Sequence, residues 1–292
     1  MRKLIILLLF TAATISFFSC SNDNSSNEEP MLIIKFKFDE NQTRLNNLGQ
    51  PSTIPAGNAA QSPIFNSISA HYVELAPNAN TQIGQGTIVY HAPETTTGGS
   101  NAIDFGQSKI VSEGETFLKI PLSQVAAGSY QWMRVSLSYQ NYQINIHHQG
   151  IDYPGTIASF VGFNTYISTF NIGNNIFPVN GNKAQGYWAF GLNNQPYSSS
   201  GQAPAGTTTV PNPIEATSPI PRNLNSCVVT GNFSNNLVIN GNETRDVTIT
   251  LSLSINNSFE WHEITADGKY EPSIGENVVD MGLRGLIPTS VK

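Results

Sequence analysis

Alternation of hydrophobic and polar residues predicts β-strands along most of this chain. The cleanest run is Asp246–Ile255, where every second residue is apolar. Other segments with alternation or a high content of β-branched and aromatic residues are Leu32–Phe38, Ile64–Leu75, Gly86–Tyr90, Glu115–Ile120, Thr156–Phe163, Thr165–Ile172 and Gln185–Phe190. A helical period is absent from the sequence, and only Leu122–Ala127 suits a single helical turn. The pattern therefore predicts an all-β protein, an antiparallel β-sandwich.

Two places in this pattern predict a change of direction. Within Tyr130–His148, apolar residues occupy odd positions from Met133 to Tyr139 and even positions from Ile144, so we expect a bulge or a turn in residues 140–143. After Asp246–Ile255, the pair Asn256–Asn257 precedes the apolar segment Phe259–Glu263. This arrangement predicts a β-hairpin.

Two long stretches, residues 39–63 and 191–225, lack a strand pattern and are rich in Pro, Gly, Asn or Ser. A linker in the second stretch would separate only about 67 residues from the rest, too few for a stable sandwich of their own. We therefore expect one β-sandwich domain over residues 31–292 with long polar loops, and two subdomains divided at 191–225 remain the alternative.

The N-terminus has the composition of a secretory signal. Arg2 and Lys3 precede the mostly apolar run Leu4–Phe18, and Ser19–Cys20 follow. A small residue directly before Cys resembles a bacterial lipoprotein signal, which implies that residues 1–19 are removed and Cys20 is lipidated. An ordinary cleaved signal and an uncleaved anchor are the alternatives. Residues 20–30 then predict a polar, disordered tether, and the protein is expected to be an outer-membrane lipoprotein, periplasmic or surface-exposed.

The composition narrows the range of partners. The formal net charge is −6, and only 12% of residues are charged. This charge argues against nucleic acid and against charge-driven binding to anionic membranes, so contact with the membrane is expected through the lipid alone. Neutral polar surfaces suit a small molecule, a glycan or a protein partner. Cys227 lies among apolar residues and is expected to be a buried small hydrophobe, the alternative being a reactive or copper-binding thiol.

The candidate metal ligands are His71, His147, His148, Glu260 and His262. Adjacent His147 and His148 point to opposite faces of a strand, whereas Glu260 and His262 share a face, which suits a metal or a proton-transfer pair. The same residues fit an ordinary polar surface. His91 looks isolated in the sequence, and Asp267–Gly268 predicts a plain turn rather than a calcium loop.

Aromatic residues are the second group of candidates. Tyr142, Tyr187, Trp188 and Trp261 would stack on a ligand ring or a sugar, unless they belong to the core. Neighbouring Tyr187 and Trp188 face opposite sides of a strand, so we expect one to be buried. Nucleotide-binding and Gly-x-Ser-x-Gly motifs are absent from the sequence, and nothing singles out a catalytic pair of carboxylates. A non-catalytic binding or accessory protein is therefore the first expectation, and a carbohydrate-active enzyme is an alternative.

The order of several segments resembles the MbnP-like family of extracytoplasmic, copper-associated proteins. These segments are the opening strand Leu32–Phe38, Ile68–Leu75, Ala127–Tyr130 before a strand, and Val279–Leu286 near the end. The resemblance implies a β-sandwich associated with copper, with His71 and Tyr72 on an early strand as residues to test. Copper is the one metal cofactor that it suggests.

Overall fold

The computed structural model describes residues 29–45, 50–203 and 227–292. These residues form an all-β fold, as the sequence pattern predicts, with three short 3-10 turns. The strands are β1 Met31–Asp39, β2 Asn58–Gln61, β3 Ile64–Ala76, β4 Thr87–His91, β5 Glu94–Thr95, β6 Ala102–Asp104, β7 Thr116–Pro121, β8 Gly128–His148, β9 Ile151–Phe160, β10 Asn164–Ile172, β11 Asn175–Ala184, β12 Tyr187–Leu192, β13 Ser198–Gln202, β14 Cys227–Ile239, β15 Val247–Ser254, β16 Phe259–His262, β17 Val278–Met281 and β18 Arg284–Val291; the turns are η1 Phe105–Gln107, η2 Leu122–Gln124 and η4 Pro272–Ile274.

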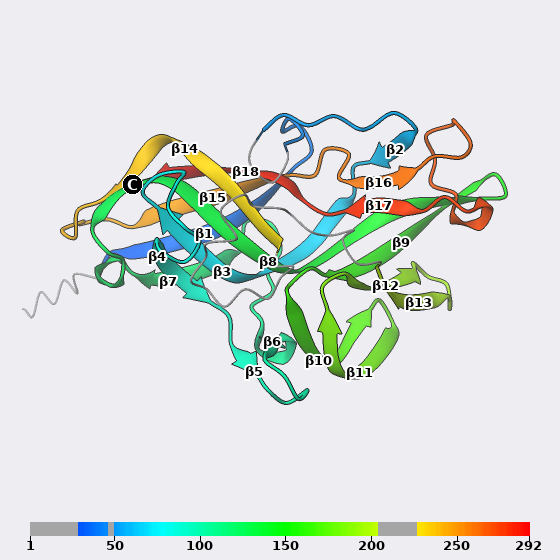
Figure 1. The fold of residues 1–292 in the computed structure, drawn as a ribbon, viewed down its shortest axis with the longest axis horizontal. Coiled ribbons are helices and arrows are strands. Elements are labelled where there is room, and N and C mark those ends of the chain that lie inside the picture. The colour runs from blue at the N-terminus through cyan, green and yellow to red at the C-terminus, as the bar shows by residue number, and fades with distance from the viewer. Residues whose placement is uncertain (1–28, 46–49, 204–226) are drawn as a thin grey trace, which may run out of the picture.

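A sheet of seven strands runs the length of the molecule, and β8 is its longest strand (Figure 1). The strand order is β13-β12-β9-β8-β3-β4, and β14 also pairs with β8. The first half of β8 pairs with β14 and the second half with β9, while β3 follows the other edge of β8 across its middle. The strand β8 therefore joins two halves of the sheet that face different neighbours.

The first half of this sheet packs against a second sheet, the β1 sheet, with order β18-β15-β1-β7. Strands β1 and β15 pair in parallel, so that Leu32 lies beside Val247 and Phe36 beside Leu251. Because the register keeps the apolar positions of both strands on one face, they enter the largest core cluster together. The parallel pair departs from the antiparallel expectation, and more than 200 residues between β1 and β15 supply the crossover that it requires.

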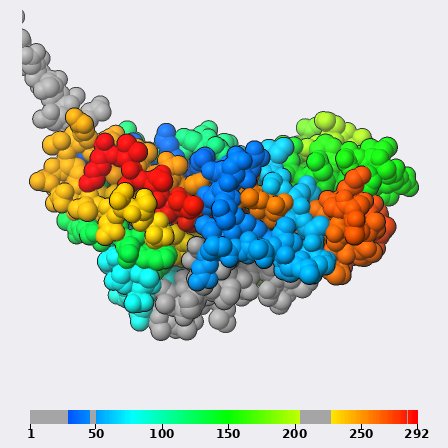
Figure 2. All heavy atoms as spheres, turned by 90° about the horizontal axis from the view of Figure 1, so that it is seen from above, coloured from blue at the N-terminus to red at the C-terminus, as the bar shows by residue number. Residues whose placement is uncertain are grey.

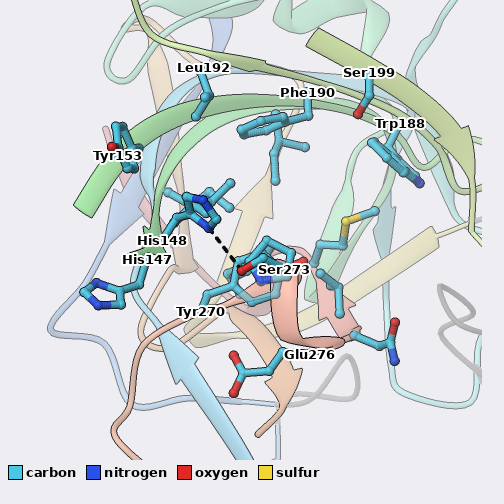
Figure 3. A pocket seen from close by; sticks show the side chains of 18 of the residues that line it. His147, His148, Tyr153, Trp188, Phe190, Leu192, Ser199, Tyr270, Ser273 and Glu276 are labelled. Carbon is cyan, nitrogen blue, oxygen red and sulfur yellow. Dashed lines mark hydrogen bonds between the residues drawn. The ribbon is translucent and has the colours of Figure 1, made fainter. Parts of the chain in front are cut away.

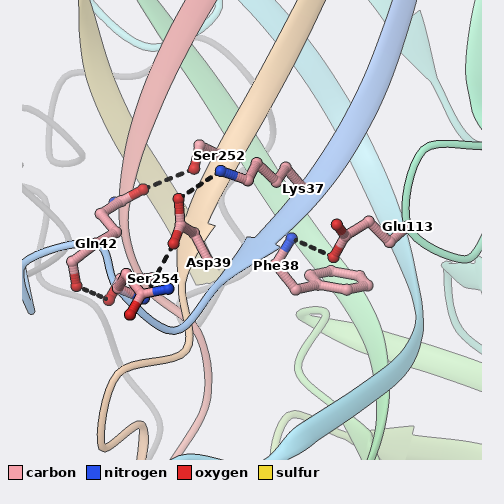
Figure 4. Close-up of polar contacts among 8 residues, drawn as sticks. Lys37, Phe38, Asp39, Gln42, Glu113, Ser252 and Ser254 are labelled. Carbon is pink, nitrogen blue, oxygen red and sulfur yellow. Dashed lines mark hydrogen bonds and ion pairs between the residues drawn. The ribbon is translucent and has the colours of Figure 1, made fainter.

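Polar contacts close the end of the β1 sheet, where the chain leaves β1 (Figure 4). Ser252 Oγ donates to the side-chain oxygen of Gln42 at 2.8 Å, and Ser254 Oγ donates to its backbone oxygen at 3.1 Å. Lys37 Nζ donates to Asp39 at 2.6 Å, and the backbone N–H of Phe38 donates to Glu113 at 3.0 Å. The bonds to Asp39 and Gln42 fix residues 39–42 at the end of the parallel pair, before the chain continues to β2.

The second half of the seven-stranded sheet is covered on both faces. The β10 sheet, with order β11-β10-β6-β5, and the β16 sheet, with order β17-β16-β2, supply the two coverings. Tyr139 packs with Phe160 on the β10 side, whereas Tyr142 packs with Phe259 on the β16 side. Each face of this half therefore needs apolar residues, which explains its dense aromatic content.

The change of phase in β8 is a bulge, but it lies before the expected residues 140–143. Tyr139 pairs with Ser69 and Leu137 pairs with Ala70, so Ser138 is one extra residue in β8. The bulge turns Tyr139 away from the core face that Leu137 occupies. The sequence predicts the bulge because the apolar residues change from odd to even positions. It places the bulge too late, because Tyr139 is apolar and odd-numbered but already lies on the opposite face.

The predicted hairpin between β15 and β16 is wrong. Asn257 adopts a left-handed backbone with φ 49°, so the chain does turn there. However, β15 already pairs with β1 and β18 on its two edges, and β16 pairs with β2 and β17. With no edge left on β15, the chain passes into the β16 sheet.

Parts of the two expected loops are strands. Within residues 39–63, β2 pairs with β16, and Figure 2 shows this blue part of the chain beside the orange residues that follow β15. Within residues 191–225, β13 pairs with β12. Neither strand contains large apolar residues in alternation, since β2 reads Asn-Ala-Ala-Gln and β13 reads Ser-Ser-Ser-Gly-Gln. These two segments are strands because they pair with β16 and β12, not because their own sequences alternate.

Cys20, the predicted signal and most of the predicted tether lie outside the described residues, as does most of the 191–225 stretch. Residues 122–124 form the expected short turn. Cys227 is buried in the main core cluster, which confirms its expected environment. Within the described ranges, no helix is long and apolar enough to cross a membrane.

Candidate functional site

A cleft of about 930 Å³ opens between the seven-stranded sheet and the β16 sheet (Figure 3). Its upper wall comes from the ends of β8 and β9 and from β12 and β13, and its lower wall from β16, η4 and β17. The lining is mostly apolar, with polar side chains among the aliphatic and aromatic ones. This size and composition are typical of sites for small molecules.

Alternation along β12 places its aromatic residues on the two faces of the sheet. Trp188, Phe190 and Leu192 line the cleft, whereas Tyr187 and Ala189 join the core under the β10 sheet. The expected division between Tyr187 and Trp188 is thus confirmed: Tyr187 is buried and Trp188 is half-buried. Gly201 of β13 lies opposite Trp188, and a Cβ there would lie 2.8 Å from the indole. The glycine therefore leaves the space that the indole occupies.

Polar groups gather at the end of the cleft near η4. His148 Nδ1 and Ser273 Oγ form a hydrogen bond of 3.2 Å, and Figure 3 shows His148 pointing toward Ser273 while His147 points away. Tyr270 lines the same region, and burial raises the pKa of its hydroxyl to about 12, so it keeps its proton at neutral pH. The pair His148–Ser273 has no carboxylate hydrogen-bonded to the imidazole among the described residues, which a nucleophile-activating triad would require. The arrangement suits hydrogen bonding to a ligand.

Glu276 organises the lower wall rather than offering its charge to the cleft. Its carboxylate accepts hydrogen bonds from the backbone N–H groups of Ile264, Thr265 and Glu271 at 3.0, 3.4 and 2.7 Å. The side chain is buried and connects the segment after β16 to η4. Because both oxygens are engaged, Glu276 holds the wall that carries Tyr270 and Ser273.

Three of the four predicted ligand-binding aromatics lie outside the accessible lining. Trp261 is 0% and Tyr142 is 1% exposed, so neither serves as a platform for a ligand. Tyr142 stacks on Phe65 with ring centroids 4.9 Å apart, and Trp261 packs against Tyr270 at 5.5 Å. They form the core that supports the cleft. Of the predicted set, Trp188 alone lines it.

The five predicted metal ligands do not meet in one group. Glu260 is paired with Arg44 and Asn58, and His147 Nδ1 is hydrogen-bonded to Asp152 at 2.5 Å. The exposed His262 has no carboxylate partner among the described ion pairs, although it shares a strand face with Glu260 as expected. Glu260 is therefore a structural residue, because its charge is balanced by Arg44.

His71 lies instead beside His91 and Glu94, a group that the sequence does not suggest. In the same way, Tyr197 and Ser273 of the cleft lie outside the predicted set. Their positions depend on pairings between strands that are distant in sequence. A hydroxyl or phenol in a polar loop carries no pattern that would single it out.

Comparison of the chain with protein families, with curated proteins and with solved structures finds no match.

Proposed function

We propose that this chain is a lipid-anchored, extracytoplasmic binding protein without catalytic activity, and that its ligand occupies the cleft between β12 and η4. The observation that carries the proposal is the cleft itself, an opening of about 930 Å³ with apolar walls and a few converging polar groups. Its upper wall is part of a continuous sheet, and its lower wall is held by Glu276. Such a site is largely formed before the ligand arrives, which reduces the entropy lost on binding.

The ligand that fits best is an amphipathic small molecule. Ile144, Ile157 and Phe190 provide a surface for its apolar body. His148 and Ser273 provide a donor and an acceptor for a polar end. Polar contacts at the end of a cleft fix the orientation of a ligand, whereas the apolar contact supplies most of the affinity.

A carbohydrate is the second candidate, favoured by the aromatic residues at the rim. Trp188 is half-buried beside the cleft, and Tyr197 is 58% exposed. Aromatic faces of this kind stack on the apolar faces of sugar rings.

Two sets of probes separate the candidates: 1-anilinonaphthalene-8-sulfonate represents an amphipathic ligand, and a panel of soluble glucose, xylose and galactose oligosaccharides represents glycans. Saturable change of tryptophan fluorescence with one set supports that ligand class, and no saturable change with either set contradicts a binding cleft.

The proposed membrane anchor rests on the sequence around Cys20, as does the outer-membrane location. Replacing Cys20→Ser removes the acceptor thiol, so the protein is expected in the soluble fraction after cell lysis. The matched control is Cys227→Ser, which changes the other cysteine and leaves the anchor. Membrane retention of the Cys20→Ser protein would contradict lipidation at Cys20.

Copper association, which the MbnP-like resemblance implies, stays a separate proposal. The predicted residues His147, His148, Glu260 and His262 give it no support, because among the described residues they do not meet in one group of metal-ligating atoms. Elemental analysis of the purified protein after dialysis against copper tests it, and less than one tenth of an equivalent retained would contradict it.

A further inference from the structure

Two histidines and a glutamate, none of which lines the cleft, meet at the edge of the seven-stranded sheet. His71 comes from β3, His91 is the last residue of β4, and Glu94 is the first residue of β5. Pairing of β3 with β4 places Tyr72 opposite His91, and the backbone N–H of Ala92 donates to the carbonyl of His71 at 2.6 Å. Strand pairing thus joins residues that are twenty positions apart.

A bulge in β3 directs His71 into this group. Opposite β8, Ala70 pairs with Leu137 and Tyr72 pairs with Ser136, so His71 is the extra residue. Bulges frequently re-aim one side chain at functional sites. The result is a buried imidazole with its ring centroid 4.7 Å from that of His91.

The three side chains offer donor atoms at nearly the spacing that a metal requires. His71 Nε2 lies 2.8 Å and His91 Nε2 lies 3.8 Å from the same oxygen of Glu94, and all three donor atoms lie within 4.8 Å of one another. Tetrahedral Zn²⁺ with bonds of about 2.0–2.1 Å places its ligand atoms roughly 3.3 Å apart. The side chain of His91 is 44% exposed and has room to rotate the small distance that remains.

Neighbouring groups orient the donors. His91 Nδ1 is hydrogen-bonded to the carbonyl of Ala92 at 3.0 Å, which places the proton on Nδ1 and leaves the lone pair on Nε2. Asn101 Nδ2 donates to the second oxygen of Glu94 at 2.7 Å. Outer contacts of this kind are typical of metal ligands, because they fix the tautomer of the imidazole and the rotation of the carboxylate.

The competing explanation for this group is a set of ordinary polar contacts without a metal. A hydrogen bond between His71 and Glu94 alone would explain two of these residues. It leaves the orientation of His91 toward the same oxygen unexplained.

We propose that His71, His91 and Glu94 bind a divalent transition-metal ion of the Zn²⁺ type, with a fourth position open to solvent or to a ligand. Two imidazoles and a carboxylate suit Zn²⁺ and other divalent ions of the first row. No Cys or Met sulfur belongs to this group of described residues, and soft sulfur ligands are the ones that select Cu⁺. The exposed side of His91 gives the ion its entry path.

The test is zinc binding by the full-length chain extracted in mild detergent. The protein is treated with EDTA, dialysed against Zn²⁺ and then against metal-free buffer, and its zinc content is measured by elemental analysis. About one Zn²⁺ per chain is expected, and a competing chelator then gives the affinity. His91→Ala and Glu94→Gln are each expected to weaken binding at least tenfold. His262→Ala removes another exposed imidazole and is expected to leave zinc binding unchanged.

A second measurement separates loss of binding from loss of folding. His91 is at the surface, so His91→Ala should keep the wild-type circular dichroism spectrum. Co²⁺ in place of Zn²⁺ is expected to give the visible absorption of a tetrahedral site, and His91→Ala should abolish it. Three results would each overturn the proposal: no Zn²⁺ is retained, folded His91→Ala binds Zn²⁺ as tightly as the wild type, or the protein retains Cu⁺ but not Zn²⁺.

Discussion

The buried ion pair between Arg44 and Glu260 allows a quantitative test of how the lower wall of the cleft is held. Arg44 Nη2 donates to Glu260 Oε2, and Asn58 Nδ2 donates to the other oxygen at 2.5 Å. The side chains of Arg44 and Glu260 are 8% and 5% exposed. The pair therefore attaches the segment after β1 to β16, the strand whose Phe259 lines the cleft.

Glu260→Gln keeps the shape of the side chain but removes its charge. Arg44 then remains as a buried cation without a counter-charge, and breaking a buried pair in this way costs about 3–5 kcal/mol. Total stabilities of proteins are about 5–15 kcal/mol, so this loss is a large share. At roughly 2–4 °C per kcal/mol for a protein of this size, the melting temperature is expected to fall by about 6–20 °C.

Urea denaturation followed by circular dichroism measures this free energy of unfolding. The control is Lys37→Met, which breaks the exposed pair with Asp39 and is expected to cost less than about 1 kcal/mol. The double variant Arg44→Met/Glu260→Met should recover most of the loss, because it removes both buried charges. A loss below about 1 kcal/mol for Glu260→Gln would refute the reasoning.

Two further predictions concern the wall that carries the polar end of the cleft. Glu276→Ala leaves the N–H groups of Ile264, Thr265 and Glu271 without their acceptor, and is expected to cost about 2–4 kcal/mol in urea denaturation; a loss equal to that of the exposed control Glu40→Ala would contradict this role. The pKa of Tyr270 is raised by burial to about 12 from 10.0, so its contribution to stability is complete below pH 10 and is lost as pH rises toward 12. Ultraviolet absorption measures tyrosinate as the pH rises, and Tyr270→Phe should lose one of the groups that ionise above pH 10. A titration curve identical to that of the wild type would contradict the burial of the Tyr270 hydroxyl.

The alternating pattern predicts the strands well where one face is buried and the other is polar. In β15, Val247, Ile249, Leu251 and Leu253 are all 0% exposed, as their spacing predicts. The pattern fails for β2 and β13, which show no alternation of large apolar and polar residues and pair with neighbouring strands of their sheets. It also fails to predict which strands pair. The chain turns at Asn257 after β15, but β15 and β16 form no hairpin, because β1 and β18 occupy both edges of β15.

The site is less predictable, because it depends on contacts between distant strands. Trp188 is found by alternation along β12, which separates it from Tyr187. Trp261 is indistinguishable from it in the sequence, yet the β16 sheet buries Trp261 completely. His91 looks isolated in the sequence because only the β3 bulge and the pairing with β4 bring it to His71. Registers and bulges of this kind are tertiary features that a local pattern does not contain.

The most direct test of the proposed binding cleft compares the affinity of two tryptophan variants for 1-anilinonaphthalene-8-sulfonate. Trp188 lines the cleft, whereas Trp132 pairs with Ala76 and Asn232 in the other half of β8. Removing an aromatic side chain that packs directly against the ligand costs about 2 kcal/mol, which corresponds to roughly a 30-fold rise in Kd. Fluorescence titration should give this rise for Trp188→Ala and a wild-type Kd for Trp132→Ala. Equal Kd values for wild type and Trp188→Ala would contradict the account.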